Sequence, residues 1–198
     1  MNSNQEALKF CFKHWELMCN WWNNEHYENI EILKHLQDPI IREERNSQIE
    51  QVTEEAESQI KECFNKFYEE IKLNTANGFS LARRNKRNGW DFELMILQPN
   101  KSSLKDYNST IGVNFDEDRN LTLWCWKKGG NAAGKHLLDV FKGINPTPSL
   151  TEKETVYLLR HQISSNMPLE DIQIGLKKCI ELISKISIQQ LNQIVAEL

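Results

Sequence analysis

The sequence contains few residues that interrupt regular structure, and it has no long apolar run. Only eight glycines and five prolines occur among its 198 residues, which excludes a collagen-like chain or one made mostly of flexible linkers. No stretch of about 18 apolar residues is present, so we expect no membrane-spanning helix and no membrane partner. The first residues lack a basic stretch followed by an apolar one, so we also expect no secretory signal.

Cysteine is scarce, and its spacing fits neither a disulfide framework nor a metal site. The number of cysteines is odd, and no two lie closer than eight positions along the chain. The C-x2-C pair common in zinc sites is therefore absent. We expect reduced, buried thiols in a cytoplasmic protein, with no metal and no cofactor. The five thiols belong to Cys11, Cys19, Cys63, Cys125 and Cys179.

Neither charge sign dominates, because the net charge is only -4. That value alone does not indicate a nucleic-acid-binding protein. It conceals an asymmetry, since residues 1–75 contain 15 acidic and 8 basic side chains and the remainder contains 13 acidic and 16 basic ones. Such a division can hold two parts of a chain together or orient a partner, and it does not choose between these roles.

The N-terminal part has the apolar spacing of helices. An apolar seam with spacings of three and four residues starts at Leu8 and predicts a first helix. Asp38 and Pro39 predict a helix start, and a thin apolar stripe with a charged back follows to Ile71. We therefore expect a long helical hairpin over residues 1–77, of coiled-coil character, through which a homodimer could form.

The middle of the chain has the character of a sheet. Residues 90–97, 110–115 and 121–126 read as strands, and the short link between the last two predicts an antiparallel hairpin. A short strand over residues 79–81 could precede them. We expect a three-stranded antiparallel sheet over about residues 90–127.

The C-terminal part reads as helices. One helix is expected over residues 132–141, and Thr151 with Glu154 has the capping-box form that predicts another over residues 151–163. Pro168 opens the last helical stretch, and Ser187 begins a separate short helix. The fold class is thus α+β, with C-terminal helices packed on the sheet in a second part, residues 78–198, continuous with the hairpin.

Residues 129–135 match the form of a phosphate-binding loop, G-x-x-x-x-G-K. His136 stands where such a loop needs a hydroxyl for Mg²⁺, and no strand follows that could complete a parallel nucleotide-binding sheet. A glycine-rich turn into a helix is therefore the favoured interpretation. Anion binding at that helix N-terminus, with Lys135 nearby, is the physically easier alternative.

Two carboxylates raise the alternative of a metal-dependent nuclease. Asp91 and Glu93 are two positions apart on an expected strand, and Lys127 ends the third strand. The usual carboxylate-x-Lys triplet is missing, because Cys125 occupies the carboxylate position and Mg²⁺ prefers oxygen ligands. Solvent-facing charges are the simpler interpretation.

A basic segment at residues 83–87 could contact a nucleic acid. Four cations in five residues, followed by a tryptophan, can grip a phosphate backbone and stack a base. A solvated loop, or pairing with the acidic hairpin, explains the same pattern. The candidate nucleic-acid or anion-binding residues are Arg83, Arg84, Lys86, Arg87, Trp90 and Lys135.

Aromatic residues are the clearest candidates for contacts with a protein partner. The first helix carries apolar rings on more than one face, which exceeds what one neighbouring helix can cover, and two tryptophans alternate on the third strand. Tryptophan often anchors protein interfaces. The candidate partner-binding residues are Trp15, Trp21, Trp22, Trp124 and Trp126.

No complete set of catalytic residues is recognisable in the sequence. We therefore expect a non-catalytic protein-interaction module, such as an inhibitor, immunity factor or accessory subunit that acts by binding a protein. The alternative is a nucleic-acid-binding or nuclease-like protein that uses residues 83–87 with Asp91 and Glu93.

Overall fold

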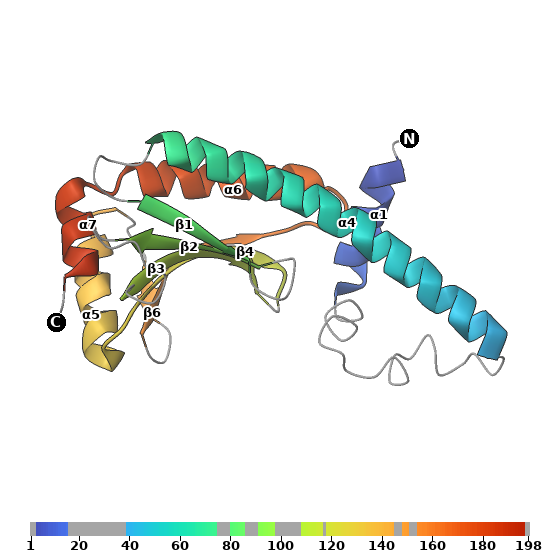
Figure 1. Ribbon diagram of the computed structural model, residues 1–198, viewed down its shortest axis with the longest axis horizontal. Helices are drawn as coiled ribbons and strands as arrows, with labels where there is room; N and C mark the ends of the chain where they lie inside the picture. Colours follow the sequence, from blue (N-terminus) through green and yellow to red (C-terminus); the bar gives the residue numbers. More distant parts are fainter. Residues whose placement is uncertain are drawn as a thin grey trace.

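The computed structural model has an α+β fold, in which helices lie along one side of a curved antiparallel sheet (Figure 1). This agrees with the fold class expected from the sequence. The structure describes residues 3–15, 39–74, 80–85, 91–97, 108–116, 118–144, 148–150 and 154–196.

The N-terminal part consists of helix α1 (Ser3–Lys13) and the long helix α4 (Pro39–Asn74). They pack together through apolar side chains, among which Leu8 of α1 and Ile60 of α4 are fully buried. With 36 residues, α4 is about 54 Å long. Its start at Pro39 confirms the expected helix start, while Trp21 and Trp22 lie outside the described residues. A homodimer through these helices remains a prediction.

The sheet has six strands in the order β1-β2-β3-β4-β6-β5, and every neighbouring pair is antiparallel. The three expected strands correspond to β2, β3 and β4, and the short extra strand corresponds to β1. The sheet is wider than expected because β6 and β5 extend it beyond β4. The strands are β1 (Ser80–Asn85), β2 (Asp91–Leu97), β3 (Ser109–Phe115), β4 (Asn120–Lys127), β5 (Ser149–Leu150) and β6 (Thr155–Gln162).

The helix expected over residues 151–163 is wrong, because residues 155–162 form strand β6. Val156 and Leu158 are buried in the core, and the segment is rich in β-branched, aromatic and leucine side chains that suit a strand beside β4. Glu154 does not cap a helix in its own segment. Its carboxylate accepts hydrogen bonds from Trp126 and from the backbone of Gly130.

Helix α5 (Gly130–Phe141) follows β4 in the sequence, and helices α6 (Pro168–Ser184) and α7 (Ile188–Val195) follow β6. The start of α6 at Pro168 and the separate short helix after Ser187 agree with the sequence. Ser187 and Gln190 form a reciprocal capping box, in which each side chain satisfies the other's backbone N–H group.

The main core lies between the sheet and its helices. Helices α4 and α6 run side by side, and α5 and α7 contact each other at one end of the sheet (Figure 1). Helix α6 approaches the sheet closely at Gly175, where an added Cβ would lie 2.5 Å from Leu121 and 2.8 Å from His161. At the other end, the rings of Phe12 and Phe64 pack within about 6 Å of Phe115, which ties α1, α4 and β3 together.

Within the described residues, no helix is both long enough and apolar enough to span a membrane.

Candidate functional site

The side of the sheet opposite the helices carries a row of aromatic side chains. Leu121 and Cys125 of β4 are fully buried, and Leu121 packs against α6. Because side chains alternate along a strand, Trp124 and Trp126 project to the side of the sheet opposite Leu121 and α6. Tyr157 of β6 is the register partner of Trp124. We call Trp124, Trp126 and Tyr157, all half-buried, the aromatic face.

Trp124 is fixed over β3 by a glycine and an amide. Its ring lies so close to Gly112 that an added Cβ would come within 2.0 Å of a ring carbon. Its Nε1–H donates to Oδ1 of Asn114 at 3.0 Å, and the hydroxyl of Thr122 donates to the same oxygen. The indole therefore has one defined orientation, with its only donor already used.

Trp126 is held by a carboxylate that also binds the first residue of helix α5. Its Nε1–H donates to Oε2 of Glu154 at 2.6 Å, and Oε1 of Glu154 accepts the backbone N–H of Gly130 at 2.8 Å. Gly130 is the first residue of α5, so the carboxylate lies at the positive end of that helix. Both indole N–H groups of the aromatic face are thus bound within the protein.

Tyr157 carries an arginine on its ring. The guanidinium carbon of Arg160 lies 4.6 Å from the centre of the Tyr157 ring. Nε of Arg160 lies 3.8 Å from Oδ2 of Asp116, a long ion pair in which the arginine side chain is 52% exposed. Asp116 is also engaged by Asn120, whose backbone and side-chain N–H groups donate to it.

A bulge brings Tyr157 and Arg160 to the same side of β6. Residues three apart on a regular strand project to opposite faces. Here Trp124 pairs with Tyr157 while Leu123 pairs with Leu159, so one residue of β6 is skipped. The skipped residue, Leu158, is buried, and the irregularity re-aims Arg160 toward the aromatic face.

The nucleic-acid candidates are only partly described. Arg83 and Arg84 belong to β1, so this part of the basic segment is strand, not loop. Lys86, Arg87 and Trp90 lie outside the described residues. In the strand register, Asp91 pairs with Asn114 and Glu93 with Gly112.

Lys127 does not join these carboxylates, because it is engaged elsewhere. Its side chain is 1% exposed and its ammonium donates to the backbone carbonyls of Ile194, at 2.6 Å, and Ala196 in the last turn of α7. Burial lowers its pKa. Cys125 is also buried, which raises the pKa of its thiol. A nuclease site that needs Lys127 beside a metal has no support in this arrangement.

The glycine-rich motif at residues 129–135 does not have the setting of a phosphate-binding loop. It follows a strand of an antiparallel sheet, and the backbone N–H of Gly130 already donates to Glu154. Lys135 is exposed on α5, and Nε2 of His136 lies 2.9 Å from the carbonyl of Gln193 in α7. The first N–H group of this helix thus already has an acceptor within the protein, and anion binding beside Lys135 stays a prediction.

Trp15 belongs to the packing between the helices and the sheet. Its ring stacks on Phe12 at 5.1 Å and meets the edge of Phe115 at 5.9 Å. Trp15 is half-buried among these rings and is not part of the aromatic face.

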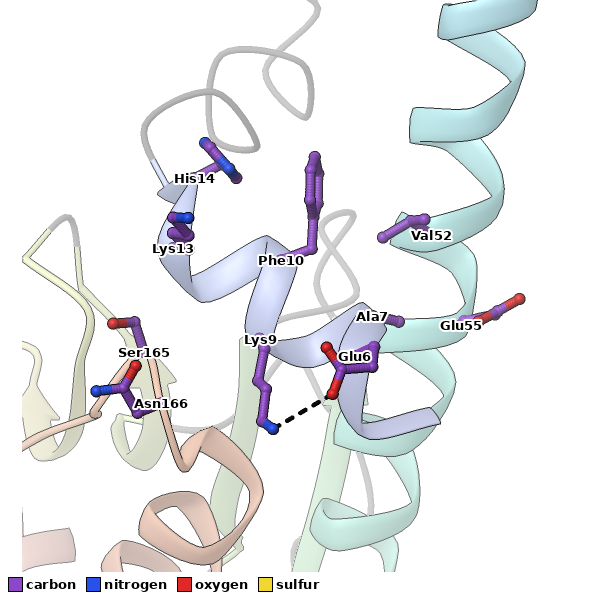
Figure 2. A pocket seen from close by; sticks show the side chains of 10 residues that line it. All are labelled: Glu6, Ala7, Lys9, Phe10, Lys13, His14, Val52, Glu55, Ser165 and Asn166. Carbon is purple, nitrogen blue, oxygen red and sulfur yellow. Dashed lines mark hydrogen bonds and ion pairs between the residues drawn. The ribbon is translucent and has the colours of Figure 1, made fainter. Parts of the chain in front are cut away.

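A groove of about 700 Å³ lies between α1, α4 and the loop before α6 (Figure 2). Phe10 and Val52 form its apolar part. Its charges are mixed, because acidic and basic side chains line it together and one pair, Lys9 and Glu6, lies 3.3 Å apart. The groove therefore favours no single class of ligand. The lining residues are Glu6, Ala7, Lys9, Phe10, Lys13, His14, Val52, Glu55, Ser165 and Asn166.

No protein-family model matches the chain, and neither a curated protein nor a solved structure matches it. In the part of the chain that the structure describes, no three His, Cys, Asp or Glu side chains are grouped so as to hold a metal ion. The candidate functional site is therefore the aromatic face.

Trp124 and Trp126 are partner-binding candidates from the sequence alone, whereas their neighbours on this face are not. Tyr157 and Arg160 were missed because their segment was assigned to a helix, and Glu154 because it was interpreted as a helix cap. The buried pair Val156 and Leu158, alternating with Tyr157, was the available signal for a strand.

Proposed function

We propose that this protein is a non-catalytic binding module whose aromatic face contacts a protein partner. The observation that carries the proposal is that Trp124 and Trp126 are each fixed by an internal hydrogen bond through Nε1. Fixed rings lose little conformational entropy on binding, and their exposed parts offer apolar contact area. Large aromatic side chains of this kind are frequent anchors of protein interfaces.

The charges around the aromatic face favour a protein over a nucleic acid. Asp116 and Glu154 flank the rings, and Arg160 is the cation in contact with them. A polyanionic backbone would be repelled by the two carboxylates, and its affinity depends on several cations acting together. The nucleic-acid alternative, through the basic segment at residues 83–87, stays a prediction.

The proposed mode of action is binding without catalysis. An inhibitor, immunity factor or accessory subunit acts by occupying a partner's surface and needs no catalytic group. A cytoplasmic location is part of the proposal, supported by the free thiols of Cys11, Cys63, Cys125 and Cys179.

Site-specific photo-cross-linking tests the proposal. A benzophenone amino acid replaces Tyr157 in one variant and the exposed Lys177 of α6 in the control, and both are irradiated in host cells. We expect a discrete protein adduct from position 157 that survives nuclease digestion and is absent from position 177. An adduct removed by nuclease, equal adducts at both positions, or no adduct at position 157 would contradict the proposal.

A further inference from the structure

Arg160, beside the aromatic face, is a charged residue that is both exposed and weakly paired. The side chain of Arg160 is 52% exposed, and its contact with Asp116 is 3.8 Å long, beyond hydrogen-bond distance. Within the described part of the chain, no hydrogen bond reaches its guanidinium group. The Nε1–H groups of both indoles are used internally, whereas the guanidinium group of Arg160 still has donors to offer.

Asp116 is not a full counterion for Arg160. Its Oδ1 accepts backbone N–H groups from Asp118 at 3.1 Å and from Asn120 at 2.8 Å, and the side-chain amide of Asn120 reaches both oxygens. The carboxylate thus closes the turn between β3 and β4 and is only 17% exposed. The guanidinium fork is left to face solvent.

The guanidinium group is also held in place for binding. Stacking on Tyr157 at 4.6 Å restricts its plane, and the bulge at Leu158 puts both residues on one side of β6. Bulges often re-aim side chains near functional sites. An arginine pre-oriented by an aromatic ring loses less freedom when its fork binds a carboxylate in a bidentate manner.

We propose that Arg160 anchors the protein partner through a carboxylate side chain, while an adjoining apolar side chain of the partner packs on Trp124 and Tyr157. The proposal rests on the proposed function and names the partner's chemistry, an exposed segment in which a single acidic residue adjoins apolar ones. Trp124 and Tyr157 are register partners, so the apolar contact lies directly beside the fork.

A phosphate could also bind a guanidinium fork, but a nucleic acid suits this surface less well. Arg160 is the cation that contacts the Tyr157 ring, and the carboxylates of Asp116 and Glu154 lie close to this surface. A single side-chain carboxylate brings one negative charge to the guanidinium fork and brings no further negative charge near Asp116 and Glu154. A nucleic acid presents phosphates in a row.

The test uses three acetylated octapeptides in which one glutamate, glutamine or lysine stands between two leucines and the other residues are neutral. Binding is followed by the indole N–H resonances of Trp124 and Trp126 in the full-length protein, assigned with Trp→Phe variants. We expect the glutamate peptide to shift these resonances and the glutamine peptide to bind about tenfold more weakly or worse, since charge-assisted bonds are lost. The lysine peptide is expected not to bind.

Substitutions of Arg160 test whether its guanidinium group causes the preference for glutamate. Arg160→Gln is expected to remove the preference for glutamate over glutamine, and Arg160→Lys to recover only part of it, because a lysine lacks the bidentate fork. Lys177→Gln removes the same charge from the exposed side of α6 and is expected to leave the affinity unchanged.

Four results would overturn the inference: no preference for glutamate, equal binding of the lysine peptide, unchanged affinity in Arg160→Gln, or stronger shifts with a thymidine octanucleotide. The cross-linking result from position 157 is independent of all four. If it yields a protein adduct while the peptides show no preference, the binding function stands and only the acidic anchor is wrong.

Discussion

Replacing the buried Lys127 by methionine should detach the end of helix α7. The ammonium of Lys127 binds two carbonyls of the last turn, those of Ile194 and Ala196, and Asn108 donates to the carbonyl between them, on Val195. The last carbonyls of an α-helix lie beyond its own N–H groups, and here the side chains of Lys127 and Asn108 bind them. Methionine keeps most of the stem and its packing but removes both hydrogen bonds.

The expected change in the free energy of unfolding is the difference between two opposing contributions. Hydrogen bonds to a charged group contribute about 1.5–3 kcal/mol each. Burial of the ammonium costs part of that gain, as the lowered pKa of Lys127 shows, and the cost disappears with the charge. We therefore expect a net loss of about 2–3 kcal/mol in the free energy of unfolding, or roughly 4–12 °C in Tm for a chain of this size.

Urea denaturation and amide hydrogen exchange measure the two parts of this prediction. The exposed neighbour Lys128→Met is the matched control, because it removes the same charge from the same strand end. We expect α7 amides to lose protection only in the Lys127 variant. A change below about 0.5 kcal/mol, the range of ordinary surface substitutions, or unaltered exchange in α7 would refute the role assigned to the ammonium.

Three further predictions concern single contacts. Gly112→Ala should push the Trp124 ring from its place, because the new Cβ would lie 2.0 Å from it; we expect a loss of about 1–3 kcal/mol and a shifted indole resonance. Burial lowers the pKa of His161 below its usual 6.5, and the nearby charge of Lys178 lowers it further. Asp171 partly opposes both effects. The unfolded chain therefore takes up the proton first, so stability should be full above about pH 6.5 and fall at lower pH; in urea titrations at several pH values, His161→Gln should flatten this dependence. Ser187→Ala should cost about 1 kcal/mol through loss of the capping box, and an unchanged urea midpoint would contradict that.

Local signals in the sequence located most elements correctly. The start of α4 follows from Pro39, whose missing N–H and fixed φ suit the first turn, and the start of α7 follows from the capping residue Ser187. Alternation placed Trp124 and Trp126 on one side of β4. In each case the information lies within a few residues of the element itself.

The remainder depends on contacts between distant parts of the chain. Strand β6 was assigned to a helix because Thr151 and Glu154 imitate a helix start, and only pairing with β4 selects the extended form. The bulge at Leu158, which puts Arg160 beside Tyr157, arises from that same pairing. The partners of Lys127 lie 67 and 69 residues further along the chain, so no local pattern could indicate them.

The glycine-rich motif and the aromatic face turn out to be parts of one arrangement. Gly129 and Gly130 have positive φ values, 137° and 67°, which turn the chain sharply from β4 into α5 and expose the helix's first N–H groups. The N–H of Gly130 needs an acceptor, and the carboxylate of Glu154 supplies it. Because the second oxygen of the same carboxylate holds Trp126, the sequence that imitates a phosphate-binding loop instead orients a ring of the aromatic face.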